Sequence, residues 1–111
     1  MDKATIETEL DELFSKKREM LGRIFDNSAL TTAAKKVLEK ARVEAMSQPA
    51  FAELKNDKAR EAFIKVECEK ELDQYDGRVV IDQLSAHELD LINLDIDLMR
   101  LIIRINCDWQ D

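Results

Sequence analysis

The sequence predicts an all-α protein, a helical hairpin or bundle of about four helices that ends in a long apolar C-terminal helix and forms an oligomer. Only two of its 111 residues are glycine and one is proline, which leaves few turns to connect strands. Charged residues make up 37% of the chain, and helix-forming residues are abundant. Apolar residues also recur at intervals of three and four, the spacing of one helical face. We expect one domain over residues 1–111, with helices at about residues 3–25, 28–47, 57–75 and 78–107.

The first helix carries an apolar stripe that runs from Ile6 to Phe25. Most of its acidic residues lie in its first half and most of its basic residues in its second half, an order that counters the helix dipole: Glu7, Glu9, Asp11 and Glu12 precede Lys16, Lys17, Arg18 and Arg23. Lys17 lies on the stripe between Leu13 and Met20, where a charged side chain is unusual.

Turn and cap residues divide the middle of the chain. Asp26-Asn27-Ser28 precedes a second stripe of small apolar residues, and Pro49 ends the helix that carries it. A segment of one or two helical turns is expected after Pro49, and Asn56-Asp57 caps the third helix. Gly77 marks the expected boundary between the third and fourth helices. Because a glycine costs a helix only about 1 kcal/mol, one continuous rod through Gly77 is the alternative.

The C-terminal helix is apolar around most of its circumference. Projected at about 100° per residue, one side of it carries Leu84, Leu91, Leu94, Leu98, Leu101, Ile102 and Ile105. A second group extends the apolar zone around the axis: Leu89, Ile92, Ile96, Met99 and Ile103. A helix on the surface of a bundle needs an apolar arc of little more than 100°, and this helix has roughly twice that. Either it is the central helix of a bundle, or its second group forms an interface with another chain. We favour the interface, because the other helices are thinly apolar.

Two carboxylates interrupt this apolar zone. Glu88 and Asp95 are seven residues apart and therefore lie on one line of the helix. Burial of unpaired carboxylates is costly, so one hypothesis is that Lys17 meets Asp95 or Glu88 and sets the register of the helix pair. The alternative is that all three side chains reach solvent at the edge of the stripe.

No motif indicates catalysis, a metal or a cofactor. Glu88 and Asp95 are two helical turns apart, too far to hold one ion by themselves. His87 is the only histidine and lacks the Glu-x-x-His spacing of a di-iron bundle. Cys68 and Cys107 form no Cys-x-x-Cys pair, and two glycines are too few for a phosphate-binding loop. We therefore expect a protein that is not an enzyme.

The net charge of −7 disfavours a general nucleic-acid-binding surface. Four basic residues on the second helix are still candidates for nucleic-acid contact: Lys35, Lys36, Lys40 and Arg42. Acidic residues are interleaved with them, which favours an ordinary solvated helix face. No apolar run of about 18 residues is present and no signal-peptide core follows the N-terminus, so we expect a cytoplasmic protein with no membrane contact.

The segment Lys55-Asn56-Asp57-Lys58-Ala59-Arg60-Glu61-Ala62 and the leucine-rich tail that ends in Arg100 and Arg104 resemble a family of small helical proteins. These proteins are encoded by tailed bacteriophages, in early regions near recombination and single-strand-binding genes. The resemblance covers roughly the second half of the chain. It implies a helical accessory protein that acts on host or phage DNA metabolism through protein contacts, in the host cytoplasm, and it carries over no catalytic residue.

These features together predict a homo-oligomeric protein-interaction module with an acidic surface. One concrete version is an accessory protein or inhibitor that acts on a host nucleic-acid-processing or defence enzyme, where acidic charge competes with nucleic acid at a basic groove. One alternative is a recombination accessory protein that binds single-stranded DNA through the basic residues. Another is a purely structural assembly factor.

Overall fold

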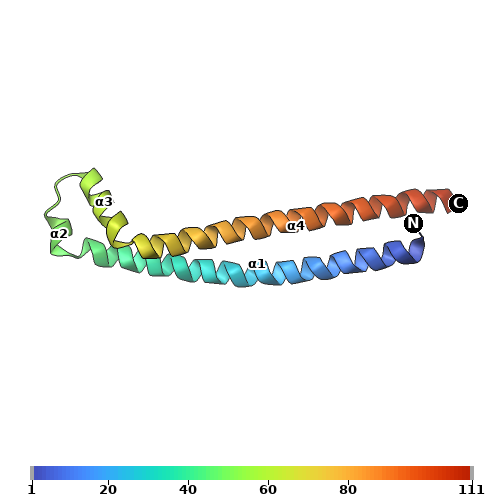
Figure 1. Ribbon diagram of the computed structural model, residues 1–111, viewed down its shortest axis with the longest axis horizontal. Coiled ribbons are helices and arrows are strands. Elements are labelled where there is room, and N and C mark those ends of the chain that lie inside the picture. Colours follow the sequence, from blue (N-terminus) through green and yellow to red (C-terminus); the bar gives the residue numbers. More distant parts are fainter. Residues whose placement is uncertain (1, 111) are drawn as a thin grey trace. The chain divides into compact units, whose positions relative to one another are not determined.

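The computed structural model describes the backbone of residues 2–110 and the side chains of residues 2–106. This part of the chain contains four helices: α1 (Lys3–Met46), α2 (Pro49–Ala52), α3 (Asp57–Glu67) and α4 (Glu69–Gln110) (Figure 1). The predicted all-α class and the long C-terminal helix are confirmed. The side chain of Cys107 lies outside the described residues.

The chain divides into two compact units, although the sequence predicts one domain. The first unit combines Met1–Asp26 with Gln83–Asp111, and the second comprises Asn27–Asp82. Each unit contains part of α1 and part of α4, and each is described by itself.

In the first unit, the N-terminal half of α1 and the C-terminal half of α4 lie side by side and run in opposite directions (Figure 1). The covered residues of α1 recur at intervals of four and three: Ile6, Leu10, Leu13, Lys17, Met20 and Ile24. Those of α4 recur in the same way: Leu89, Ile92, Ile96, Met99 and Ile103. This is the seven-residue repeat of helices that pack knobs into holes. Ile6, Met20, Ile96 and Met99 are the buried residues of this pair.

The second unit packs α3 and the start of α4 against the C-terminal part of α1. Its buried cluster consists of Leu38, Ala45 and Cys68, and partly buried side chains surround it: Ala41, Phe63, Ile64, Leu72 and Tyr75. A tilted aromatic pair joins α2 to α3, because the ring centroids of Phe51 and Phe63 are 6.0 Å apart. The Arg60 guanidinium lies 5.8 Å from the centroid of the Phe51 ring. Arg60 also donates its Nε–H to the Leu54 carbonyl at 3.1 Å, which ties the loop before α3 to the helix.

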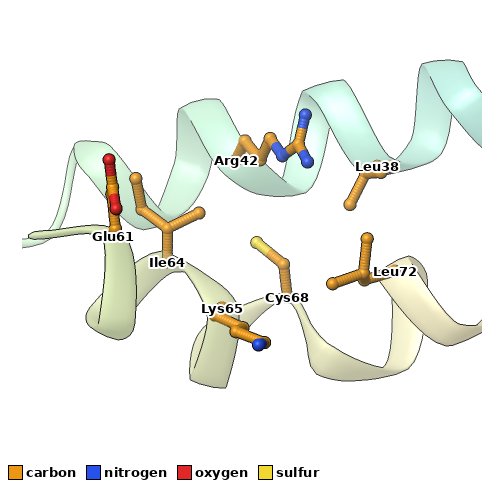
Figure 2. Close-up of a pocket in the computed structure, with 7 residues that line it drawn as sticks. All are labelled: Leu38, Arg42, Glu61, Ile64, Lys65, Cys68 and Leu72. Carbon is orange, nitrogen blue, oxygen red and sulfur yellow. The ribbon is translucent and has the colours of Figure 1, made fainter. Parts of the chain in front are cut away.

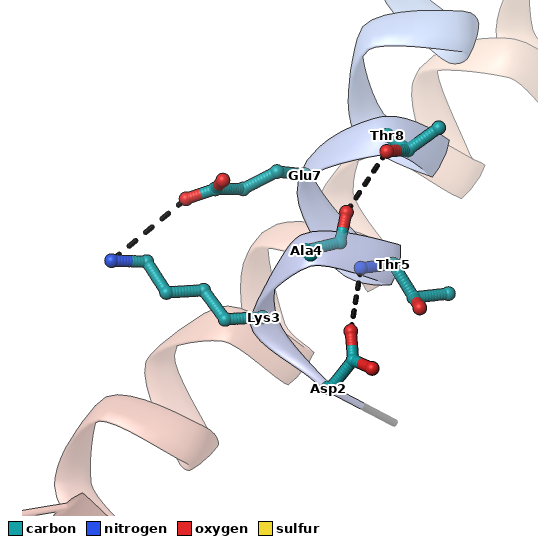
Figure 3. A network of polar contacts seen from close by, with 6 residues as sticks. All are labelled: Asp2, Lys3, Ala4, Thr5, Glu7 and Thr8. Carbon is teal, nitrogen blue, oxygen red and sulfur yellow. Dashed lines mark hydrogen bonds and ion pairs between the residues drawn. The ribbon is translucent and has the colours of Figure 1, made fainter.

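Side-chain caps define two of the helix starts. An Asp2 carboxylate oxygen accepts a 2.8 Å hydrogen bond from the Thr5 amide at the start of α1 (Figure 3). That bond lowers the pKa of Asp2, because it favours the charged carboxylate. Lys3 and Glu7 form an exposed ion pair of 3.9 Å on the next turn. At α3, the Asn56 side chain accepts from the Ala59 amide at 2.8 Å, as the sequence predicts for this cap residue.

The predicted turn at residues 26–28 is absent, because α1 continues through it as one helix of 44 residues. The backbone carbonyls of Asn27 and Ser28 lie inside the helix and accept hydrogen bonds from threonine side chains one turn later. Thr31 Oγ1 donates to the Asn27 carbonyl at 2.9 Å, and Thr32 Oγ1 donates to the Ser28 carbonyl at 3.0 Å. Asn27 is half-buried, three residues after Ile24, so it keeps the spacing of the covered face. The packing repeat thus outweighs the local preference of Asn and Ser for a turn.

The boundary between α3 and α4 falls at Cys68, about nine residues before the predicted one, and α4 passes through Gly77. Cys68 has φ −107° and ψ 14°, while its amide donates to the Ile64 carbonyl at 2.9 Å. Its side chain lies in the buried cluster. No helix-breaking residue marks this position in the sequence. The break coincides with a tertiary contact, which local sequence patterns do not encode.

Replacing Gly77 with alanine should raise the free energy of unfolding by about 0.5–1 kcal/mol, because alanine costs less conformational entropy inside a helix. A Cβ at Gly77 meets no atom within 4 Å, and its φ is not positive. Gly22→Ala inside α1 is the matched control, since a Cβ there also meets nothing. Urea denaturation measures the free energy of unfolding of both variants. Destabilisation by Gly77→Ala alone would mean that the helix turns at Gly77 after all.

Candidate protein-binding surface

The most prominent surface feature of the first unit is a row of exposed apolar side chains along α4. We call it the outer seam, and it comprises Leu84, Leu91, Leu94, Leu98, Leu101 and Ile105. These six side chains are between 41% and 59% exposed. His87 is exposed and occupies the one polar position in the row. Contiguous apolar surface of this kind commonly marks a protein-protein interface.

The outer seam repeats every seven residues, as the covered face of α4 does. From Leu84 through His87 to Ile105, its members follow one another at intervals of three and four. We call the covered face, formed by Leu89, Ile92, Ile96, Met99 and Ile103, the inner seam. At about 100° per residue the two seams are centred roughly 150° apart around the helix axis. The helix α4 therefore has two nearly opposite faces that suit helix pairing, and α1 covers one of them in this unit.

Four carboxylates flank the outer seam. On the helical projection, Asp90 and Asp97 lie along one edge of it, and Glu88 and Asp95 lie along the other. All four are exposed. Among the described residues, Lys3 and Glu7 form the one ion pair within 4.0 Å. None of the four carboxylates beside the seam is therefore paired with a cation. Between Glu88 and Asp97 the seam is therefore an apolar stripe with two carboxylates on each edge, and Arg104 follows Asp97 along its edge.

In this unit α1 covers the apolar group that the sequence assigns to a partner interface. The sequence predicts a partner interface at Leu89, Ile92, Ile96, Met99 and Ile103, but these residues form the inner seam, where Ile96 is only 2% exposed. The helical projection of the sequence identifies both apolar groups, but it does not determine which of them α1 covers. The three-and-four spacing of both groups identifies two seams, and it does not distinguish the covered seam from the exposed one. A contact with another chain stays a prediction, and the outer seam is the face available for it.

The predicted pairing of Lys17 with Asp95 or Glu88 is also not formed. Lys17 is half-buried on the covered face of α1, whereas both carboxylates are exposed beside the outer seam. The charged contact between the two helices is instead made by Arg100, whose guanidinium lies 5.6 Å from the centroid of the Phe14 ring. Lys17 therefore places a charge at a heptad position, and no described side chain forms an ion pair with it.

Replacing Lys17 with methionine should stabilise the protein by about 1 kcal/mol, because an apolar side chain then fills the heptad position and no ion pair is lost. Lys36→Met, at an exposed position of the same helix, is the control and should change stability by less than about 0.5 kcal/mol. Thermal or urea unfolding gives both values. A loss of stability in Lys17→Met would show that Lys17 has a partner that the packing does not reveal.

The second unit contains a groove of about 340 Å³ beside the buried cluster. Leu38 and Arg42 of α1, Glu61, Ile64 and Lys65 of α3, and Cys68 and Leu72 line it (Figure 2). The Cys68 side chain points toward α1 between Ile64 and Leu72. Burial raises the pKa of the Cys68 thiol, and the nearby Glu71 carboxylate adds to the effect. A neutral, buried thiol is a poor nucleophile and a poor metal ligand, so this cysteine acts as a core residue.

The four candidate nucleic-acid contacts do not form one stripe. Lys35, Lys36, Lys40 and Arg42 are all exposed on α1. Lys36 and Lys40 are one helical turn apart, while Lys35 and Arg42 follow a line about 100° away from Lys36. Arg42 also lines the groove beside Cys68. The positive charge is therefore split between two faces of the helix.

Within the described residues, no group of three or more His, Cys, Asp and Glu side chains is placed to hold a metal ion. Over the same residues, no helix is both long and apolar enough to cross a membrane. Comparison with protein-family models, curated proteins and solved structures finds no match to this chain. The resemblance to small bacteriophage proteins therefore stays an expectation drawn from the sequence.

Proposed function

We propose that this chain is a non-enzymatic protein-interaction module that binds a helix of another polypeptide along the outer seam of α4. The exposed seam is the observation that carries the proposal. It offers six leucine and isoleucine side chains at heptad spacing, all about half exposed. Burying each of them contributes on the order of 1 kcal/mol. A total near 6 kcal/mol is large enough to offset much of the cost of association.

The acidic surface supports a more specific version of this proposal. Carboxylates on both edges of the seam and a net charge of −7 favour a basic partner. Enzymes that bind nucleic acid carry such basic surfaces. An accessory or inhibitory protein that acts on an enzyme of this kind, in the cytoplasm, is the biological role that we propose. Self-association along the same seam is the other form that the interaction can take.

A double substitution in the seam tests the proposal. In Leu94→Gln with Leu98→Gln, two central contacts are lost while the inner seam stays intact, so helical content should match the wild type by circular dichroism. A tagged wild-type chain should capture a protein from source-cell lysate in stoichiometric amount, or form a dimer by solution mass, and the variant should do neither. Leu21→Gln with Phe25→Gln is the matched control, because both residues are exposed on α1 outside the seam.

The result that contradicts the proposal is equally definite. If the seam variant and the wild type capture the same proteins and have the same solution mass, the outer seam is not a binding surface. A wild-type monomer that captures nothing leads to the same conclusion.

Single-stranded DNA binding is the alternative function, and the division of Lys35, Lys36, Lys40 and Arg42 between two faces weighs against it. A fluorescent single-stranded oligonucleotide should therefore show no change in anisotropy with this protein at low salt, where phosphate contacts are strongest. Salt-sensitive binding that disappears in Lys36→Glu with Lys40→Glu would instead support a recombination accessory protein.

A further inference from the structure

We infer that the helix bound on the outer seam belongs to a different protein and carries Lys or Arg at the positions beside its own apolar heptad stripe. This inference rests on the proposed function and identifies the chemistry of its partner. The flanking carboxylates carry the argument. In paired helices the residues beside the apolar seam face each other across the interface and determine which partner and which orientation are preferred.

A second copy of this chain is a poor match in a parallel arrangement. Suppose that two outer seams paired in register. The residue just before the first apolar residue of a heptad in one helix would then face the residue just after the second apolar residue of that heptad in the other helix. Asp90 of one copy would then lie near Asp95 of the other, twice in each dimer. Like charges at such neighbouring positions are destabilising.

Antiparallel arrangements of two copies meet the same difficulty. With the seam centred between Leu94 and Leu98, Asp95 would face Asp95 and Asp97 would face Asp97. Asp90 of each copy would face Arg104 of the other, so only these outer contacts are attractive. A shift of one heptad in one direction would place Asp90 opposite Asp97. A shift in the other direction brings Asp97 near Arg104 but leaves Leu84 and Leu91 uncovered. Self-pairing thus either opposes carboxylates or leaves part of the seam in water.

A basic-flanked helix can pair with all four flanking carboxylates at once. Glu88 and Asp95 on one edge, and Asp90 and Asp97 on the other, can each face a Lys or Arg of the partner. Because these carboxylates are exposed and none is paired with a cation in this chain, the new ion pairs break no existing ones. The apolar stripe provides most of the affinity, and the charges select the partner.

Two synthetic helices of about four heptads test the inference with the full-length protein. Both have Leu and Ile in the apolar stripe, and they differ only in having Lys or Glu at every flanking position. Each peptide repels its own copies to the same degree, so both are equally available for binding. Fluorescence anisotropy at low salt should show that the Lys-flanked peptide binds about 10- to 100-fold more tightly. At about 1 M salt, where the screening length is about 3 Å, the ratio should approach one.

Charge reversal on the protein provides the matched control. Asp90→Lys with Asp97→Lys should reduce or invert the preference between the two peptides. Asp11→Lys with Glu19→Lys changes the net charge by the same amount at exposed positions of α1 in the same unit, and the preference should survive there. A preference lost equally in both variants would mean that total charge, and not the edges of the seam, selects the peptide, and this would overturn the inference.

The remaining outcomes separate this inference from the proposed function. Equal binding of both peptides, lost in Leu94→Gln with Leu98→Gln, would overturn the basic-partner inference and leave the binding seam in place. A stable homodimer that neither peptide displaces would identify a second copy as the occupant and would likewise overturn the inference alone. If neither peptide binds and the protein is a monomer, both the inference and the proposed function fail.

Discussion

The burial of one heptad face of each long helix is the interaction on which the rest of this structure depends. In the first unit, α1 buries Ile6 and Met20, and α4 buries Ile96 and Met99. One helix can cover only one side of its neighbour, because helices pack along a narrow line of contact. The sequence places two apolar seams on nearly opposite sides of α4. The exposed outer seam is therefore a direct consequence of pairing α4 with a single helix.

The same constraint makes the buried core small. Seven hydrophobic residues are buried among those that the structure describes, and two of them, Ala45 and Cys68, have small side chains. Net stability is a small difference between burial and conformational entropy, so a core of this size leaves a narrow margin. A helix bound on the outer seam would bury apolar side chains in the native state alone and would stabilise that state by mass action. Binding and folding are thus expected to be thermodynamically coupled in this protein.

Features set by local chemistry or by long periodicity were predictable from the sequence. The helix class, the Asn56 cap and the unusual apolarity of α4 belong to this group. The turn expected at residues 26–28 did not form, because Asn27 and Ser28 can cap a helix or lie within one, and the packing repeat decides between the two. The break at Cys68 coincides with the burial of that side chain, and no local sequence pattern marks it. The choice between the two seams depends on which face α1 covers, and a single-helix projection contains no information about its neighbour.

The charges beside the outer seam explain why an exposed apolar stripe need not make this chain associate indiscriminately. An apolar seam alone would pair with many amphipathic helices, including its own copies, because hydrophobic contact is not directional. In the proposed binding mode, the carboxylates on both edges would disfavour acidic or identical partners and favour basic ones. Each such charge contributes only about 0.2–0.5 kcal/mol at an exposed position. Four of them acting together separate matched from mismatched partners by a factor of ten or more. The acids at Glu88 and Asp95 would then set specificity from the edge of the seam, where they are exposed as in the second of the two sequence-based hypotheses, and not through a buried pairing with Lys17.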